Sequence, residues 1–240
     1  MTNSDITFRD DMTVSLVKAS ASDSDVVWSA RVSTEGNRSL EALEADPEAS
    51  AGLIRYLIKN RHSSPLEHSV FTFYIETPIF VVRELERHRI ASYNEESGRY
   101  KELRPVFYVP GPDRKLVQIG KTGHYQFEDG TYMQKKVVSA DIKRIATESF
   151  SAYRRLLDLG IAKEVSRMVL PVNIYTSLYM TVNARSLMNI LSLRTNHPEA
   201  AYPSKPMREI EMVAEQMEAI FAEKMPITYQ AFVDNGRVSP

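Results

Sequence analysis

The stretch VFTFYIETPIFVVRELERHRIASYNEESGRY, residues 70–100, decides the fold. Its first part, Val70–Thr77, alternates large apolar residues with more polar ones, which is the two-residue period of a strand with two different faces. Pro78 follows, and proline is favoured in the first turn of a helix. We therefore predict a strand that leads directly into a helix, with Arg87–Arg89 at the end of that helix.

The residues after this helix predict a turn that can bind an anion. Asn94, Ser97 and Gly98 favour turns. Arginine binds phosphates and planar oxygen edges through paired hydrogen bonds, which lysine does less well. The Ser97–Arg99 turn offers a hydroxyl, close backbone approach and a charge to the same anion. We therefore expect a site for one nucleotide or more.

Two simpler interpretations remain open for this stretch. The arginines could belong to a solvated helix face paired with Glu84 and Glu86, each pair contributing only about 0.2–0.5 kcal/mol. Ser97 could be a nucleophile, but the local sequence has neither a G-x-S-x-G elbow nor an adjacent base. A phosphate contact is the better interpretation of Ser97.

The composition excludes several classes of function. The chain of 240 residues has a net charge of -1, whereas a general nucleic-acid binder carries a basic excess. It has no cysteine, which excludes disulfides, thiolate zinc sites, iron–sulfur clusters and a cysteine nucleophile. His62, Glu67 and His68 have an uncommon spacing for metal ligands and no evident further ligand, so we expect no metal. The chain shows no signal-peptide pattern and no apolar run near the roughly 20 residues of a membrane span, so we expect a cytoplasmic protein.

Periodicity predicts one α+β domain over residues 1–240, with a central, mostly antiparallel sheet flanked by helices. One long amphipathic helix is expected at Tyr132–Leu159, ended by Gly160. Its apolar stripe is expected at Val138, Ile142, Ile145, Ser149, Tyr153 and Leu156. The other expected elements are strands at Met12–Ala19 and Asn173–Val182, helices beginning near Ser22 and at Pro47, a short helix near Leu40–Ala45, and helices at Ala162–Val169, Ala184–Arg194 and Met207–Lys224.

A second polar set surrounds the helix expected at Ala184–Arg194. Asn183 is a good N-cap for it, and Arg194 at its end can pair with the helix dipole. Arg167 can form an ordinary surface pair with Glu164. Taken singly, these residues are weak signals of function.

Taken together, the two polar sets resemble a known family. The order Arg-His-Arg, seven residues and then Ser, from Arg87 to Ser97, resembles the signature of the flavin-dependent thymidylate synthases. The flanking stretch PLEHSVFTFYIETPIFVVREL and the later block EVSRMVLPVNIYTSLYMTVNARSLMNILSLR also resemble that family. The resemblance covers roughly residues 53–104 and 164–194, and is looser elsewhere.

The resemblance implies an activity and a set of binding residues. It implies a homotetramer that methylates dUMP to dTMP, with FAD sites built from several subunits. Methylenetetrahydrofolate would supply the carbon, and NADPH, through the flavin, the reducing equivalents. The implied FAD contacts are Ser64, Arg87, His88, Arg89, Glu95, Asn183, Arg185 and Asn189. The implied dUMP contacts are Glu84, Glu96, Ser97, Gly98, Arg99, Arg167 and Arg194. His62 matches a position on the folate and nicotinamide side of the flavin.

The absence of cysteine agrees with this resemblance. The other class of thymidylate synthase activates uracil C5 by adding a cysteine thiolate at C6. The resemblance instead implies that Arg194 is catalytic, polarising the pyrimidine edge and stabilising the negative charge that develops there. Two positions depart from the family pattern: Glu84 stands where some relatives carry Gln, and the loop of residues 195–206, including His197, matches poorly.

Two other hypotheses about the function remain open. The chain could be another FAD- or nucleotide-binding enzyme with the same fold. It could also be a non-enzymatic nucleotide- or RNA-binding module that uses the Arg-His-Arg segment, although the near-neutral charge speaks against this.

Overall fold

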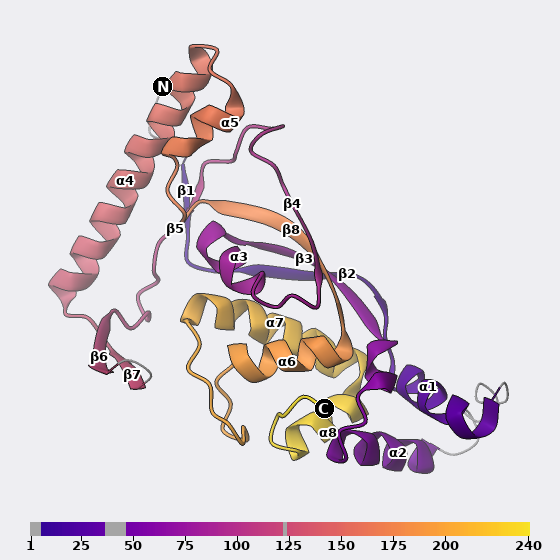
Figure 1. The fold of residues 1–240 in the computed structure, drawn as a ribbon. Coiled ribbons are helices and arrows are strands. Elements are labelled where there is room, and N and C mark those ends of the chain that lie inside the picture. The colour runs from indigo at the N-terminus through magenta and orange to yellow at the C-terminus, as the bar shows by residue number, and fades with distance from the viewer. Residues whose placement is uncertain (1–5, 37–46, 122–123) are drawn as a thin grey trace. The chain divides into compact units, whose positions relative to one another are not determined.

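The computed structural model describes residues 6–36, 47–121 and 124–240 (Figure 1). The short helix expected near Leu40–Ala45 lies outside the described residues. The chain divides into two compact units. The first unit contains the residues up to Met12 together with Glu76–Glu84 and Glu95–Ser177, and the second contains Thr13–Ile75, Leu85–Asn94 and Leu178–Pro240.

A four-stranded sheet with the order β2-β3-β8-β4 provides most of the strand structure of the second unit. Its strands are β2 (Thr13–Ser20), β3 (Val70–Pro78), β8 (Tyr175–Asn183) and β4 (Ser92–Glu95). The hydroxyls of Thr72 and Thr181 lie 3.0 Å apart, and the rings of Tyr74 and Tyr179 contact each other. The residue number rises along β3 as it falls along β8, so these two central strands run antiparallel, as predicted.

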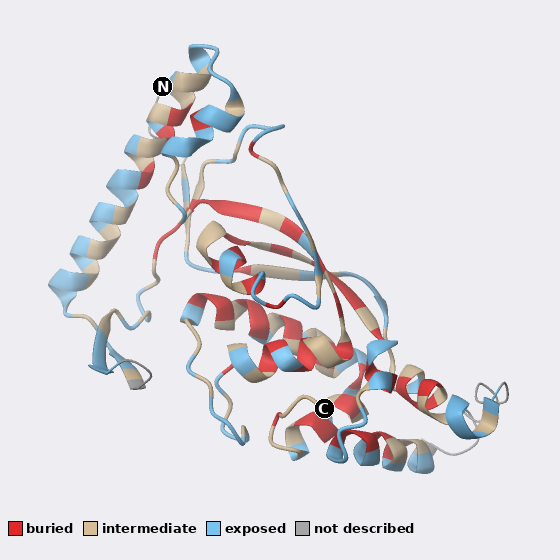
Figure 2. Ribbon diagram, viewed as in Figure 1, coloured by how far each residue is buried: buried red, intermediate tan, exposed pale blue. Residues whose placement is uncertain are grey.

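The two faces of β3 differ as its alternating sequence predicted. Phe71, Phe73 and Ile75 are completely buried. Helix α7 (Arg208–Lys224) covers this face, and the ring of its Phe221 meets Phe71 edge to face, with centroids 6.0 Å apart. Helix α6 (Ala184–Arg194) packs against α7, and buried residues follow both helices in Figure 2. This apolar layer fixes the position of α6.

The described residues of the second unit form three further helices. They are α1 (Asp23–Glu35), α2 (Pro47–Lys59) and α8 (Pro226–Asp234), and a 3-10 turn, η3 (Ser64–Glu67), precedes β3. Ser22 and Asp25 form a reciprocal capping box at the start of α1. Helix α8 was not predicted. The carboxylate of Asp23 accepts hydrogen bonds from the first backbone N–H groups of α8, at Ile227 and Thr228, which a reading of the local sequence misses.

The first unit is built around the long helix α4 (Tyr132–Asp158), which confirms the prediction for this region. Its core contains Phe107, Ala146, Phe150, Tyr153 and Ile174. The predicted stripe is partly wrong, because Ile145 is 46% exposed while its neighbour Ala146 is buried. The predicted stripe placed Ile145 on the buried face, but the core accepts the face that carries the small Ala146 and the large Phe150.

Short elements surround α4. Strand β1 (Thr7–Arg9) pairs in parallel with β5 (Val106–Tyr108), and β6 (Val117–Lys121) pairs antiparallel with β7 (His124–Glu128). The predicted helix at Ala162–Val169 is divided into α5 (Lys163–Ser166) and a 3-10 turn, η4 (Arg167–Val169). Among the described residues no helix is long and apolar enough to cross a membrane.

The helix after β3 is shorter than predicted. Helix α3 (Ile79–Leu85) ends before Arg87–Arg89, so these three residues lie in a turn and not on a helix. The Tyr93 hydroxyl lies 2.6 Å from the carbonyl oxygen of Leu85 and 3.0 Å from that of His88, which satisfies carbonyls at the helix end. The residues after Ser92 form strand β4 where a turn was predicted, and the turn begins only at Gly98.

Candidate functional site

The second unit joins two residues that the sequence analysis placed in different roles. Nε of Arg194, the last residue of α6, donates a hydrogen bond to Nε2 of His88 at 3.1 Å. A histidine nitrogen that accepts a hydrogen bond carries no proton, so this geometry requires neutral His88. Burial, assisted by the charge of Arg194, lowers the pKa of His88 to about 4. His88 is therefore a neutral acceptor that orients the cationic Arg194.

Tyr93 supports the backbone of the turn that carries His88. Its hydroxyl contacts the carbonyl oxygens of Leu85 and His88, as described above. Burial, with a smaller contribution from Glu86, raises the pKa of Tyr93 to about 12. The hydroxyl therefore keeps its proton at neutral pH and remains a hydrogen-bond donor to the backbone of the Arg-His-Arg turn.

The start of α6 positions two more of the predicted flavin residues. Asn183 caps the helix, and its side-chain oxygen accepts from the backbone N–H of Ser186 at 2.8 Å, as predicted. A cap of this kind typically contributes about 1 kcal/mol. The guanidinium of Arg185 forms an ion pair with Glu67 at 2.6 Å. Asn183 therefore has a structural role that accounts for its position without any ligand.

Other predicted residues of the second unit lie at the surface. Arg87, Arg89, Asn189 and Ser64 are exposed, and so is His62, whose ring meets the edge of Tyr56. Exposed arginine, amide and hydroxyl groups are suitable donors for a diphosphate or a flavin ring. This set differs from His88 and Asn183, whose polar atoms already bind other parts of the protein.

The first unit contains the Ser97–Arg99 turn. The Ser97 hydroxyl accepts from the backbone N–H of Arg99 at 3.2 Å. Nε of Arg99 lies 2.8 Å from a carboxylate oxygen of Glu164, and both side chains are about half exposed. The sequence allowed a surface pair between Glu164 and Arg167, and the structure pairs Glu164 with Arg99 instead. An exposed pair of this kind contributes little to stability, so an anion can replace Glu164 at small cost.

Gly98 lies directly against Arg167. A Cβ atom added at Gly98 would meet Cδ of Arg167 at 3.2 Å and Cδ1 of Leu103 at 3.0 Å. The structure therefore brings two predicted nucleotide residues together, although about seventy positions separate them in the sequence. Only a residue without a Cβ allows this approach without displacing a neighbour.

Carboxylates next to this turn already have partners. Glu95 accepts from the Thr176 hydroxyl at 2.7 Å, and Glu96 accepts from Nζ of Lys101 at 2.5 Å. Arg104 lies 2.7 Å from Glu76 and 3.9 Å from Glu96. Lys101 and Arg104 were not among the residues predicted for the site. Because both cations follow Arg99 by only a few residues, the sequence could have placed them near the Ser97–Arg99 turn. Glu84 is half-buried on α3.

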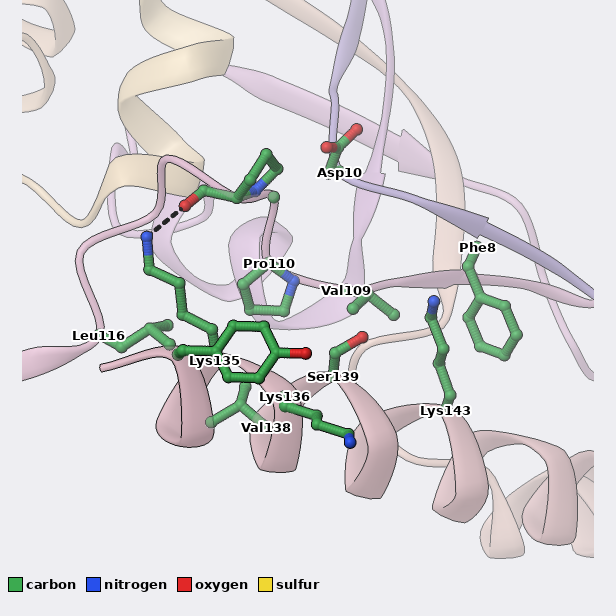
Figure 3. A pocket seen from close by; sticks show the side chains of 13 residues that line it. Phe8, Asp10, Val109, Pro110, Leu116, Lys135, Lys136, Val138, Ser139 and Lys143 are labelled. Atoms are coloured by element: carbon green, nitrogen blue, oxygen red, sulfur yellow. Dashed lines mark hydrogen bonds between the residues drawn. The ribbon is translucent and has the colours of Figure 1, made fainter. Parts of the chain in front are cut away.

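A pocket of about 570 Å³ lies at the start of α4 (Figure 3). None of its lining residues was predicted to belong to a functional site. Its lining includes Phe8, Asp10, Lys135, Lys136 and Lys143. Nζ of Lys135 donates to the carbonyl of Pro112 at 2.7 Å, and Nζ of Lys143 lies over the ring of Phe8. Because the ammonium groups point to different partners, the pocket offers no convergent set of donors.

Among the described residues, no group of three His, Asp or Glu side chains is placed to hold a metal ion.

Comparison with known proteins identifies relatives over nearly the whole chain. A family model described as thymidylate synthase complementing protein matches residues 15–227. The flavin-dependent thymidylate synthase of Streptomyces avermitilis is 57% identical over 234 residues, covering 97% of this chain and 95% of that protein. The enzyme of the same name from Streptomyces coelicolor is 54% identical over 236 residues, covering 98% and 96%.

Solved structures agree with these sequence relatives. The UMP/dUMP methylase PolB from Streptomyces cacaoi, bound with 5-Br dUMP, superposes with a TM-score of 0.92 at 52% identity, covering 98% of this chain and 100% of that one. The same protein bound with 5-Br UMP gives a TM-score of 0.91 at 51% identity, with the same coverage.

Proposed function

Because this chain belongs to the flavin-dependent thymidylate synthases, we propose that it methylates dUMP to dTMP. The observation that carries the proposal is Arg194, a guanidinium held through Nε by the neutral His88 in a chain that has no cysteine. Uracil C5 is a weak nucleophile and must be activated. Arg194 is the group proposed to do so.

Arg194 would act by electrostatics. Its guanidinium stabilises negative charge on N3 and the adjacent oxygen of the pyrimidine, which raises the electron density at C5. The hydrogen bond from Nε to His88 fixes the plane of the guanidinium before the substrate arrives. A donor that is already oriented stabilises the developing charge without reorganising during the reaction.

The turn of the first unit would hold the phosphate of the nucleotide. Ser97 supplies a hydroxyl, Gly98 allows close backbone approach, and Arg99 and Arg167 supply charge. These contacts lie on a part of the substrate that does not react, and they would spend binding energy on orienting the pyrimidine. Glu84 and Glu96 complete the proposed nucleotide set.

The exposed donors of the second unit suit FAD. Arg87 and Arg89 can pair with the diphosphate, and Ser64, Arg185 and Asn189 offer further donors. His88, Glu95 and Asn183 belong to the same proposed set, although His88 and Asn183 would act mainly by holding Arg194 and α6. When bound, the flavin supplies the reducing equivalents from NADPH, which no side chain can provide. Methylenetetrahydrofolate would donate the carbon on the side of His62 and leave as tetrahydrofolate.

The assembly is also part of the proposal. We expect a homotetramer in the cytoplasm, with each flavin site built from residues of more than one subunit. The surface exposure of Arg87, Arg89 and Asn189 in one chain supports this, because a neighbouring subunit can complete an open set of donors.

UMP is a second candidate substrate. PolB, which is 51–52% identical and superposes over 98% of this chain, is described as a UMP/dUMP methylase. We expect dUMP to be preferred, because the curated relatives named thymidylate synthases reach 57% identity. Parallel assays with dUMP and UMP decide between the two.

A flavin assay tests the proposal. The purified protein should be yellow, and its flavin, reduced by NADPH without oxygen, should be reoxidised when dUMP and methylenetetrahydrofolate are both added. Reoxidation that does not depend on the nucleotide would favour a different flavoprotein. A colourless protein with salt-sensitive RNA binding would favour the non-enzymatic module.

A further inference from the structure

The segment Gly236–Pro240 runs along α6 and is attached to it at both ends. Near the start of the helix, the Ser239 hydroxyl donates to the carbonyl of Arg185 at 3.0 Å, and Nε of Arg185 donates to the carbonyl of Pro240 at 3.0 Å. Near its end, the Ser192 hydroxyl donates to the carbonyl of Arg237 at 2.5 Å. The segment therefore spans most of the helix that carries Arg194.

Arg237 is the centre of these contacts. Its side chain is only 1% exposed, and its guanidinium donates to both carboxylate oxygens of Glu218 on α7, at 2.5 and 2.8 Å. The same guanidinium donates to the hydroxyl of Thr195 at 2.7 Å. Its backbone has a φ of 58°, an uncommon conformation for a residue with a side chain.

Thr195 transmits this contact to the end of α6. Its hydroxyl accepts from Arg237 and donates to the carbonyl of Leu191 at 2.7 Å, and its backbone N–H also donates to that carbonyl. Thr195 is therefore fixed on two sides. Because it follows Arg194 directly in the chain, the position of the Arg194 backbone depends on it.

The adjoining loop is held by the same segment. The backbone N–H of Ala201 donates to the carbonyl of Gly236 at 2.9 Å. A Cβ atom at Gly236 would approach the Cβ of Ala201 to 2.8 Å. The segment thus fixes the loop of residues 195–206 as well as the helix that precedes it.

We propose that Gly236–Pro240 is a positioning segment for the active site, with Arg237 acting through Thr195 to hold Arg194 at the place where the pyrimidine is activated. The proposal rests on the function proposed above. Arg237 and the rest of the segment lie outside residues 15–227, which the family model matches.

The energetics of a buried ion pair favour a positioning role for Arg237 over a role in stability alone. A buried ion pair such as Arg237–Glu218 is often no more stabilising than apolar residues of the same volume, because both charges lose water. Its advantage is a fixed geometry with several directional bonds. A displacement of about 1 Å in a catalytic group can lower a rate roughly a hundred-fold, so even partial release of Arg194 should be measurable.

Substitution of Thr195 tests the link while keeping the Arg237–Glu218 pair. Thr195→Val removes the hydroxyl with little change in volume, and Thr195→Ser restores it. The matched control is Thr228→Val on α8, since Thr228 is also buried and its hydroxyl donates to Asp23 at 2.6 Å. If the two valine variants lose the same thermal stability, a difference in turnover between them reports on positioning and not on stability.

The expected result is a loss of about ten-fold in kcat for Thr195→Val, with a change of less than about three-fold in KM for dUMP. Thr195→Ser should recover most of the turnover, and Thr228→Val should keep it. Hydrogen exchange of a peptide covering residues 186–196 should become faster in Thr195→Val alone.

Failure of the positioning role and failure of the proposed function give different results. If Thr195→Val and Thr228→Val behave alike in both turnover and exchange, the positioning role is wrong. If the wild-type protein makes no dTMP, the proposed function fails. The exchange comparison then still decides whether the Thr195 hydroxyl holds the end of α6, because that measurement needs neither substrate nor flavin.

Discussion

Arg194 and His88 are joined by a hydrogen bond of 3.1 Å, although 106 positions separate them in the chain. The bond runs from the guanidinium Nε to the imidazole Nε2, so His88 must be neutral for it to exist. The histidine of the Arg-His-Arg turn thereby orients the arginine at the end of α6. This relationship assigns His88 a positioning role that its place in the motif did not reveal.

Replacing His88 should change the dependence of stability on pH. The pKa of His88 is lowered from 6.5 to about 4 in the folded protein, chiefly by burial. Between these values the unfolded chain binds a proton that the folded chain does not, so the free energy of unfolding decreases as the pH falls from about 6.5 to about 4. His88→Gln keeps an acceptor for Arg194 but cannot titrate, and urea unfolding should show a smaller decrease over this range. An unchanged pH dependence in His88→Gln would contradict the neutral state of His88.

Gly98→Ala should weaken nucleotide binding through Arg167. The new Cβ would lie 3.2 Å from Cδ of Arg167 and 3.0 Å from Leu103, so one of them must move. We expect the affinity for dUMP, measured by calorimetry, to fall about ten-fold, equivalent to about 1.4 kcal/mol. Gly52→Ala is the control, because a Cβ at Gly52 meets nothing within 4 Å and alanine favours the helix. Equal affinities in the two variants would remove Gly98 from the phosphate site.

Arg99→Ala should weaken the binding of dUMP by more than the loss of the Arg99–Glu164 ion pair accounts for. A charge-assisted contact to a phosphate is worth about 1.5–3 kcal/mol, so the dissociation constant of dUMP should rise at least ten-fold. Glu164→Gln removes the partner of Arg99 and leaves its charge, and should keep or improve the affinity. If both variants lose affinity equally, Arg99 acts through Glu164 and not through the phosphate.

Arg87→Ala should reduce the retention of FAD. Arg87 is exposed, so its loss should leave the thermal stability of the apoprotein unchanged. We expect less flavin absorbance per protein after gel filtration and a weaker affinity in fluorescence titrations. Arg83→Ala, at another exposed arginine in the same stretch of chain, should retain the flavin like the wild type. Full retention in Arg87→Ala would exclude this arginine from the flavin site.

Local sequence was sufficient where local forces set the structure. Asn183 was expected to cap the helix at Ala184–Arg194, and it does so at the predicted position. The alternation in Val70–Thr77 predicted the buried face of Phe71, Phe73 and Ile75, although Thr72 and Thr77 are buried as well. In both cases neighbouring residues supply the deciding hydrogen bond or the deciding apolar face.

Distant contacts explain the errors. The helix after Pro78 ends at Leu85, whose carbonyl accepts a hydrogen bond from the Tyr93 hydroxyl, and sequence periodicity carries no sign of that contact. Helix α8 begins where Asp23, more than two hundred residues earlier, caps it. The partner of Arg194 was hidden for the same reason. The residues of the candidate site were proposed from the sequence, but the contacts that orient them appear only in the folded chain.

Turnover of the Arg194→Ala variant tests whether Arg194 activates the pyrimidine. Wild-type protein and variant are incubated without oxygen with dUMP, methylenetetrahydrofolate and NADPH, and dTMP is measured by mass spectrometry. We expect dTMP from the wild type and a loss of at least about a hundred-fold in the variant, the scale seen when one preorganised donor is removed. Flavin content should be unchanged. Near-normal dTMP formation by Arg194→Ala would rule out the catalytic role of Arg194.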